Sequence, residues 1–281
     1  MRIRDIFVVI IFGLVMRAFA EILIANTLGG DPYYIDLYCA GGMYLVIGAI
    51  LWSMIHKSSL SFKEIIGSPV SKMESLKMII LAVFLLAFTM GESAIEVMIM
   101  ARVDLNFAYK FWPFHSERII PHPIWSSKVL LYITVHVLIA PFLEEFIYRG
   151  LLLNSLKSKV GLLSAVVLSS LIFTILHFSS HYYISTFIFS VVLCCVYVSR
   201  QSLLSCIVIH SAFNLLAFLH QYYADTFWTR PINQIASIYD WIPQIIMFAL
   251  SSLFFLYLLI RHLKQMRNSV NDPIPKSFPA Q

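Results

Sequence analysis

Residues 127–155, SKVLLYITVHVLIAPFLEEFIYRGLLLNS, form an apolar run that is interrupted by two adjacent glutamates and an arginine. A run of this length can cross a bilayer, because a transmembrane helix needs about 20 mostly apolar residues. Charged side chains inside such a helix cost on the order of 2.5–3.5 kcal/mol each on insertion scales, so they normally face a protein interior or a water-filled cavity. The stretch therefore predicts a membrane helix whose charged side chains point into the protein.

The rest of the chain has the composition of a membrane protein. Of its 281 residues 59% are hydrophobic and 12% are charged, and the mean hydropathy is +0.81. Apolar runs of span length predict transmembrane helices at about 5–28, 36–56, 76–101, 127–155, 161–181, 182–199, 201–223 and 241–262. The first run extends past the site at which a secretory signal would be cleaved, which favours a retained helix. We predict an all-α fold, a bundle of about eight transmembrane helices around a polar intramembrane cavity.

The basic residues predict the orientation of the chain. With alternating spans, 13 of the 20 Lys and Arg residues fall on one side of the membrane and 5 on the other. Basic loops stay in the cytoplasm, so both termini are predicted to be cytoplasmic. The net charge of +5 is explained by these loops, which can face anionic lipid headgroups, and we predict no nucleic-acid partner. The four cysteines form no CxxC pair and are interpreted as small buried hydrophobic residues.

Helical spacing separates the two glutamates of the first stretch. Glu145 and Arg149 are four residues apart in the order that favours an ion pair, so they can neutralise each other. Glu144 is rotated about 100° from Glu145 and has to find water, a histidine or a proton. Pro141 cannot donate to the carbonyl of Val137 and is expected to kink this span.

Two further spans carry polar residues on one face. In LIFTILHFSSH, 171–181, His177 shares a face with Phe173 and with His181, and in IVIHSAFN, 207–214, His210 and Asn214 lie one turn apart. A carboxylate, two imidazoles and a carboxamide can therefore converge in one cavity. Among the remaining polar residues of the spans, His136 and His220 are interpreted as histidines that pack helices together, and Arg17 with Glu21 as an ion pair. Glu92 and Glu96 are like charges one turn apart, so either one of them is protonated or both line a polar path.

These residues resemble the signatures of a known family. EEFIYRG is similar to the EExxxR motif, FTILH to FxxxH and HSAFN to HxxxN of the CPBP family of intramembrane proteases, which includes type II CAAX prenyl endopeptidases and bacteriocin-processing or immunity proteins. The resemblance implies a helical membrane bundle in a bacterial plasma membrane, with a cavity that opens to the cytoplasm. It divides the chain into three N-terminal spans (1–124), a catalytic core of four spans (125–225), and a last span with a disordered cytoplasmic tail (226–281).

The same residues can perform peptide hydrolysis, which needs a base for water, donors to the oxyanion and a proton for the leaving amine. Glu144 is the candidate base. The resemblance implies that His177 holds and polarises the water and that His210 and Asn214 donate to the oxyanion. Glu145 and Arg149 are expected to order the helix end and to grip the substrate backbone or a terminal carboxylate.

This reading predicts an endopeptidase without a cofactor that acts on a membrane-associated protein or peptide. One alternative is a zinc-dependent version of the same protease, with ligands His177, His181 and Glu144, although position 178 is not the glutamate of an HExxH site. A non-enzymatic membrane partner of the immunity type would use the polar cluster for packing only. A proton-coupled transporter is a further alternative, and the lack of an evident inverted repeat counts against it.

Overall fold

The structure is a computed structural model that describes residues 3–27, 32–57, 62–111, 126–177, 183–223 and 234–271. The described residues form helices α1 (Ile3–Thr27), α2 (Pro32–His56), α3 (Phe62–Ile66), α4 (Lys72–Val103), α5 (Leu105–Phe111), α6 (Ser127–Tyr132), η1 (Ile133–Ile139), α7 (Ala140–Glu145), η2 (Phe146–Leu153), α8 (Asn154–Val160), α9 (Leu162–Leu176), α10 (Tyr183–Arg200), α11 (Leu203–Tyr223), η3 (Ile238–Trp241) and α13 (Ile242–Asn271). Five of these segments, from α6 to α8, are one continuous helical rod.

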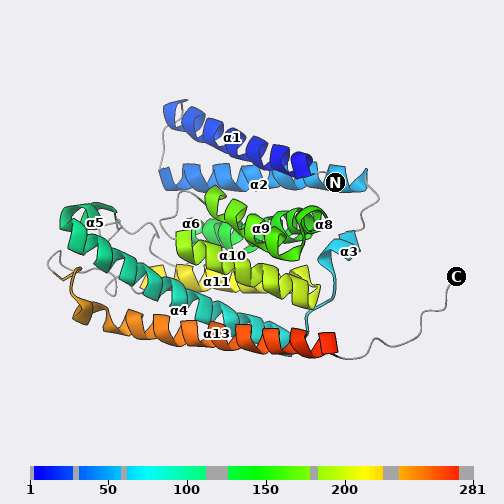
Figure 1. The fold of residues 1–281 in the computed structure, drawn as a ribbon. Coiled ribbons are helices and arrows are strands. Elements are labelled where there is room, and N and C mark those ends of the chain that lie inside the picture. Colours follow the sequence, from blue (N-terminus) through cyan, green and yellow to red (C-terminus); the bar gives the residue numbers. More distant parts are fainter. Residues whose placement is uncertain are drawn as a thin grey trace.

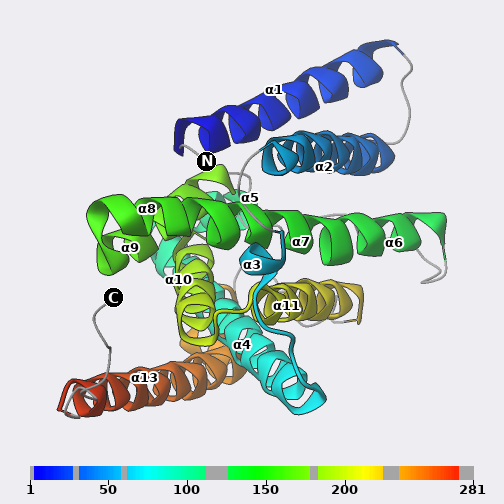
Figure 2. The same cartoon turned by 90° about the vertical axis from the view of Figure 1, so that its right-hand side faces the viewer.

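The long helices are arranged in three layers (Figures 1 and 2). On one side α1 packs along α2, and on the other side α4 packs along α13. The middle layer contains the rod from α6 to α8, together with α9, α10 and α11. The three motifs all lie in this middle layer, so the outer layers separate them from much of the surroundings.

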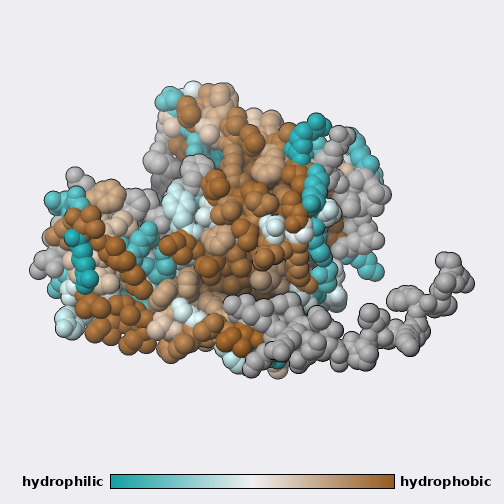
Figure 3. All heavy atoms as spheres, in the orientation of Figure 1, coloured by the Kyte–Doolittle hydropathy of each residue, from teal (hydrophilic) through white to brown (hydrophobic). Residues whose placement is uncertain are grey.

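The outside of the bundle is apolar, as expected of helices that face lipid. Seven of the described helices are long and apolar enough to cross a membrane, a total that counts the rod from α6 to α8 once. Large side chains such as Val15, Leu45 and Leu253 are more than half exposed. In Figure 3 apolar residues cover most of the visible face, and hydrophilic residues gather mainly toward its ends. The chain is an integral membrane protein with an all-α polytopic fold, as the sequence predicts.

The predicted span at 161–181 is shorter than expected. Its helix, α9, contains 15 residues and ends at Leu176. At 1.5 Å per residue it is roughly 22 Å long, less than the roughly 30 Å hydrocarbon core of a bilayer. The helix stops because His177 leaves helical geometry, with φ −97° and ψ 33°, and its ring nitrogen Nδ1 bonds to the carbonyl oxygen of Phe173. His177 therefore lies at a helix end rather than in the middle of a span.

One end of the bundle is tied together by polar contacts. Gly67, just before α4, pairs with Ser202, between α10 and α11, in an isolated β-bridge. Arg200 bonds to Glu74 at 3.0 Å, and Ser71 and Glu74 form a capping box at the start of α4. The beginning of α1 and the end of α13 lie at this same end in Figure 1.

The predicted disordered tail falls largely on residues 272–281, which are outside the described residues. The predicted division of the chain into 1–124, 125–225 and 226–281 stays a prediction.

Candidate active site

Two π-helical segments flank the glutamates, with η1 directly before α7 and η2 directly after it. π-helical turns are rare and occur frequently at functional sites. The first follows from Pro141, which has no N–H group to donate. The N–H of Ala140 bonds to the carbonyl of Val135 rather than to that of His136. A π-helical partner for His136 would be Pro141 itself, so the helix cannot supply a donor to the His136 carbonyl.

Asn214 supplies that missing donor from α11. Its Nδ2 atom donates to the carbonyl oxygen of His136 at 2.8 Å. A buried carbonyl without a partner costs about 1–3 kcal/mol, so this contact stabilises the helix just before the glutamates. An amide nitrogen carries two hydrogens, and the second one remains for another acceptor. In the sequence this contact is signalled only by Pro141, which lies about one turn before the EExxxR motif. The proline predicts a carbonyl group without a helical donor, but it does not predict which residue donates to it.

Glu144 lies on α7 where it faces residues from three other helices, α2, α9 and α11, and its side chain is only 12% exposed. Its Oε1 atom accepts a hydrogen bond of 2.5 Å from the hydroxyl of Tyr44 on α2. Its Oε2 atom is 3.6 Å from Nε2 of His177 and 3.8 Å from Nε2 of His210. These last two distances exceed a direct hydrogen bond, and polar groups at such separations commonly share a water molecule. Both Nε2 atoms therefore lie within 4 Å of the same carboxylate oxygen.

Glu145 and Arg149 form the predicted ion pair, and both side chains are 0% exposed. Arg149 donates to Glu145 at 2.8 Å and to the Ser190 hydroxyl on α10 at 2.9 Å. The same Oε1 atom of Glu145 lies 2.7 Å from Nδ1 of His210. The pair thus also holds a histidine that the sequence assigned to another motif. Complete burial in this structure leaves neither side chain exposed to a substrate backbone or terminal carboxylate.

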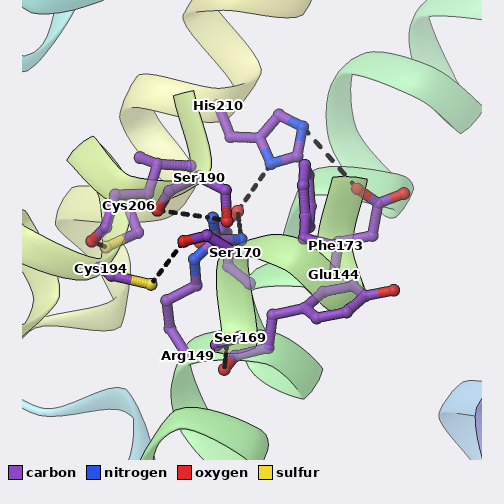
Figure 4. Close-up of polar contacts among 12 residues, drawn as sticks. Glu144, Arg149, Ser169, Ser170, Phe173, Ser190, Cys194, Cys206 and His210 are labelled. Atoms are coloured by element: carbon purple, nitrogen blue, oxygen red, sulfur yellow. Dashed lines mark hydrogen bonds and ion pairs between the residues drawn. The ribbon is translucent and has the colours of Figure 1, made fainter. Parts of the chain in front are cut away.

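The hydrogen-bond partners assign the tautomers of both histidines. Nδ1 of His177 is 2.7 Å from the carbonyl oxygen of Phe173, which can only accept, so Nδ1 carries a proton. Nδ1 of His210 faces the Glu145 carboxylate and is assigned a proton for the same reason. In Figure 4 the two ring nitrogens of His210 point in different directions, one of them toward Glu144. Both imidazoles thus turn Nε2 toward the Glu144 carboxylate.

Phe173 links the three motifs through its ring. The ring stacks on His177 with centroids 4.2 Å apart, the Arg149 guanidinium lies 4.8 Å from its centroid, and the His210 ring meets it edge-on at 6.1 Å. A buried aromatic ring of this kind fixes the orientation of its neighbours by packing and by cation–π attraction. The FxxxH motif therefore supplies a packing surface together with its histidine.

The structure thus brings Glu144, Glu145, Arg149, His177 and His210 together. Asn214 joins them through the His136 carbonyl. Sequence reasoning missed Tyr44, which lies outside the three motifs, and a tyrosine in an apolar helix is too common to stand out. His181 lies outside the described residues. Within the part of the chain that the structure describes, no group of three or more His, Cys, Asp or Glu residues has the arrangement of a metal site.

Arg17, Glu92 and His136, which are polar residues away from the motifs, have local partners. Arg17 forms the predicted pair with Glu21 at 2.6 Å and also bonds to Asp36. Glu92 accepts a bond of 2.6 Å from the Ser185 hydroxyl. The His136 ring packs against Tyr132 with centroids 4.8 Å apart. In the described structure these contacts join neighbouring helices or successive turns, and none of them reaches Glu144.

A bundle of span-length apolar helices around a buried cluster of carboxylates and imidazoles defines a polytopic membrane protein with an intramembrane polar site. Residues 126–216 match the model of the Rce1-like family, described as type II CAAX prenyl endopeptidase Rce1-like. The match covers less than half of the chain and includes all three motifs, which confirms the recognised resemblance. It supports an intramembrane protease of the CAAX type in general. Among curated proteins and among solved structures, no match was found.

Proposed function

We propose that the protein is an intramembrane endopeptidase that hydrolyses a peptide bond of a membrane-associated protein or peptide, with Glu144 as the base for water. The observation that carries this proposal is the convergence of Glu144 Oε2 with Nε2 of His177 at 3.6 Å and Nε2 of His210 at 3.8 Å. A catalytic base has to reach the proton that it abstracts directly or through one water molecule, and this geometry suits a water held between the three atoms.

In the proposed reaction the water donates one hydrogen to Glu144 Oε2 and the other to Nε2 of His177. Glu144 takes the first proton as the water oxygen attacks the carbonyl carbon of the scissile bond. The negative charge moves to the carbonyl oxygen, where donors aimed in advance stabilise it. When the carbon–nitrogen bond breaks, Glu144 returns its proton to the leaving amine, so the base is regenerated.

We assign the oxyanion donors to His210 and Asn214. Asn214 would use the amide hydrogen that is not engaged with the His136 carbonyl. His210 can donate from Nε2 while Nδ1–H bonds to Glu145 only if the ring carries both protons. Glu145 and Arg149 would act through His210, by holding its ring in place, rather than by gripping the substrate.

No cofactor is needed in this scheme, because a carboxylate base and protein donors fill every role. The zinc alternative, with His177, His181 and Glu144 as ligands, makes a different prediction. Exhaustive chelation of the purified protein should leave turnover unchanged under our proposal, and elemental analysis should find no stoichiometric metal. Loss of turnover on chelation, with restoration by Zn²⁺ and about one bound ion per chain, would replace the base mechanism with a metal mechanism.

The environment of the reaction is part of the proposal. We place the protein in a bacterial plasma membrane, surrounded by lipid, with its substrate entering from the cytoplasmic side. The excess of Lys and Arg in loops on one side of the predicted spans supports the cytoplasmic side, and the bacterial plasma membrane rests only on the resemblance to the CPBP family.

The experiment that tests the proposed function compares the protein termini in membranes of cells with wild-type protein or Glu144→Gln. In membranes with Glu144→Gln we expect at least one uncleaved precursor to accumulate. The new protein terminus that wild-type cleavage creates should be missing there. A peptide that spans the mapped bond should then be cleaved by the purified wild type only. Glu74→Gln is the matched control, because Glu74 lies on the exposed end of α4 and pairs with Arg200. Identical sets of termini in wild type and Glu144→Gln would reject the protease assignment.

A further inference from the structure

Tyr44 makes a contact that joins the first layer of the fold to the motif-bearing layer. It lies on α2, outside the segment that matches the family model, and is 100 residues away from its partner in sequence. Its hydroxyl donates to Oε1 of Glu144 at 2.5 Å. A carboxylate has no hydrogen to give when ionised, so the phenol must be the donor.

Two glycines lie where α2 contacts the rod that carries Glu144. A Cβ atom at Gly41 would be 3.3 Å from Val135 on η1, and one at Gly48 would be 3.6 Å from Leu143 on α7. Positions 41, 44 and 48 share one face of a helix, so Tyr44 lies between the two points of close approach. The packing of α2 against η1 and α7 brings the tyrosine hydroxyl within reach of Glu144.

The contact also gives the two oxygen atoms of the Glu144 carboxylate different surroundings. Oε1 is engaged by Tyr44, and Oε2 faces Nε2 of His177 and Nε2 of His210. A hydrogen bond to one oxygen restricts rotation of the carboxylate and leaves the other in a defined direction. In the described structure the remaining oxygen points toward the place assigned to the reacting water.

We propose that Tyr44 is a positioning residue of the hydrolytic site: it holds Oε1 of Glu144 so that Oε2 acts as the base. This inference rests on the proposed function and extends the site to a helix that the three motifs do not include. Hydrogen bonds to charged groups commonly contribute enough for a roughly tenfold to hundredfold effect on a rate. Tyr44→Phe keeps the ring and its packing and removes only the donor.

The test compares Tyr44→Phe with Tyr38→Phe in the purified full-length protein, using a peptide that spans the mapped cleavage site. Tyr38 lies on the same helix, and its side chain is mostly exposed. We expect Tyr44→Phe to lower kcat by roughly tenfold to hundredfold, with KM within about twofold of wild type. The acidic limb of its pH–rate profile should move to higher pH, because the carboxylate loses a donor that favours its charged form. Tyr38→Phe should behave as wild type in both respects.

A spectroscopic measurement reads the contact without any substrate. The infrared carbonyl band of protonated Glu144 is the band that wild type shows and Glu144→Gln lacks. In Tyr44→Phe this band should shift in frequency and appear at higher pH, and in Tyr38→Phe it should be unchanged. A thermal unfolding curve close to that of wild type would establish that Tyr44→Phe is folded.

The outcomes separate this inference from the proposed function. If Glu144→Gln is inactive while Tyr44→Phe matches Tyr38→Phe in kcat, pH profile and infrared band, the role of Tyr44 is wrong and the protease stands. If Glu144→Gln keeps wild-type turnover, the base mechanism is wrong, and the positioning role of Tyr44 is rejected with it.

Discussion

Two adjacent carboxylates have different surroundings because a helix rotates them about 100° apart. Glu144 faces the place where two Nε2 atoms and a tyrosine hydroxyl converge. Glu145 faces inward, where it is completely buried with Arg149 and contacts His210 on the side away from Glu144. At the scale of single residues, one glutamate keeps some exposure and the other is fully buried against the neighbouring histidine, which is the basis of the different roles that we propose.

This division predicts different consequences for two substitutions. Arg149→Ala leaves the Glu145 carboxylate buried without its cation, a loss on the order of 3–5 kcal/mol, so the amount of folded protein should fall sharply. Glu144→Gln keeps the shape of the side chain and should leave abundance nearly unchanged while abolishing turnover. Fluorescence-detected size-exclusion chromatography and thermal unfolding in detergent measure both effects. An equal loss of folded protein in the two variants would contradict the division.

At the scale of helices, close approach depends on small residues and on interruptions of the α-helical pattern. Pro141 and the flanking π-helical turns change the register of the rod around Glu144, and α9 ends early so that His177 lies at its end. On the other side of the bundle Gly91 on α4 allows contact with α13. A Cβ at Gly91 would lie 2.3 Å from Cβ of Phe248 and 2.4 Å from the backbone oxygen of Gln244.

Gly91→Ala is therefore expected to force α4 and α13 apart. The clash involves backbone atoms, so it cannot be relieved by a side-chain rotation, and overpacking of this kind costs about 1–3 kcal/mol. The midpoint of thermal unfolding and the yield of folded protein should both fall. Gly42→Ala is the matched control, since a Cβ there would meet nothing within 4 Å. A Gly91→Ala variant as stable as Gly42→Ala would mean that the two helices are not packed in this way.

At the scale of the whole molecule, the number of crossings decides on which side the termini lie. The helix α9 is short for a span, but it packs along α10, and α10 returns to Arg200, which bonds to Glu74 at the start of α4. A helical hairpin begins and ends on the same side of the membrane, both when it crosses the bilayer fully and when it only enters it. The hairpin therefore does not change the relative placement of the two termini.

We expect reporters inserted after Lys157 and fused at the C-terminus to report the cytoplasm, and a reporter at Asp104 to report the opposite side. The physical reason is the excess of Lys and Arg at the end that carries Lys157 and Arg200. Accessibility of single cysteines to an impermeant reagent is an independent measurement. A C-terminal reporter on the opposite side from the one at Lys157 would contradict an even number of membrane crossings between Lys157 and the C-terminus.

The features that follow from local spacing could be predicted. The seven helices of span length follow from apolar composition. The ion pairs Arg17–Glu21 and Glu145–Arg149 follow from four-residue spacing on a helix, and both kinds of pattern can be read from the sequence. The roles of Glu144, His177, His210 and Asn214 stay predictions until they are tested. The short α9 and the π-helical turns were not predicted, because a helix end inside an apolar run leaves little trace in hydropathy.

The amino-acid sequence was sufficient to predict a membrane bundle, the resemblance of its middle segment to a protease family and the polar side chains that face the interior of the bundle. Folding in three dimensions settled which of them meet. The hydrogen bond from Tyr44 to Glu144 joins residues 100 positions apart, and the contact between Glu145 and His210 joins residues 65 positions apart. The helical period relates only residues that are close in the sequence, so it cannot predict these contacts. They exist because α2 and α11 both pack against the rod that carries the two glutamates.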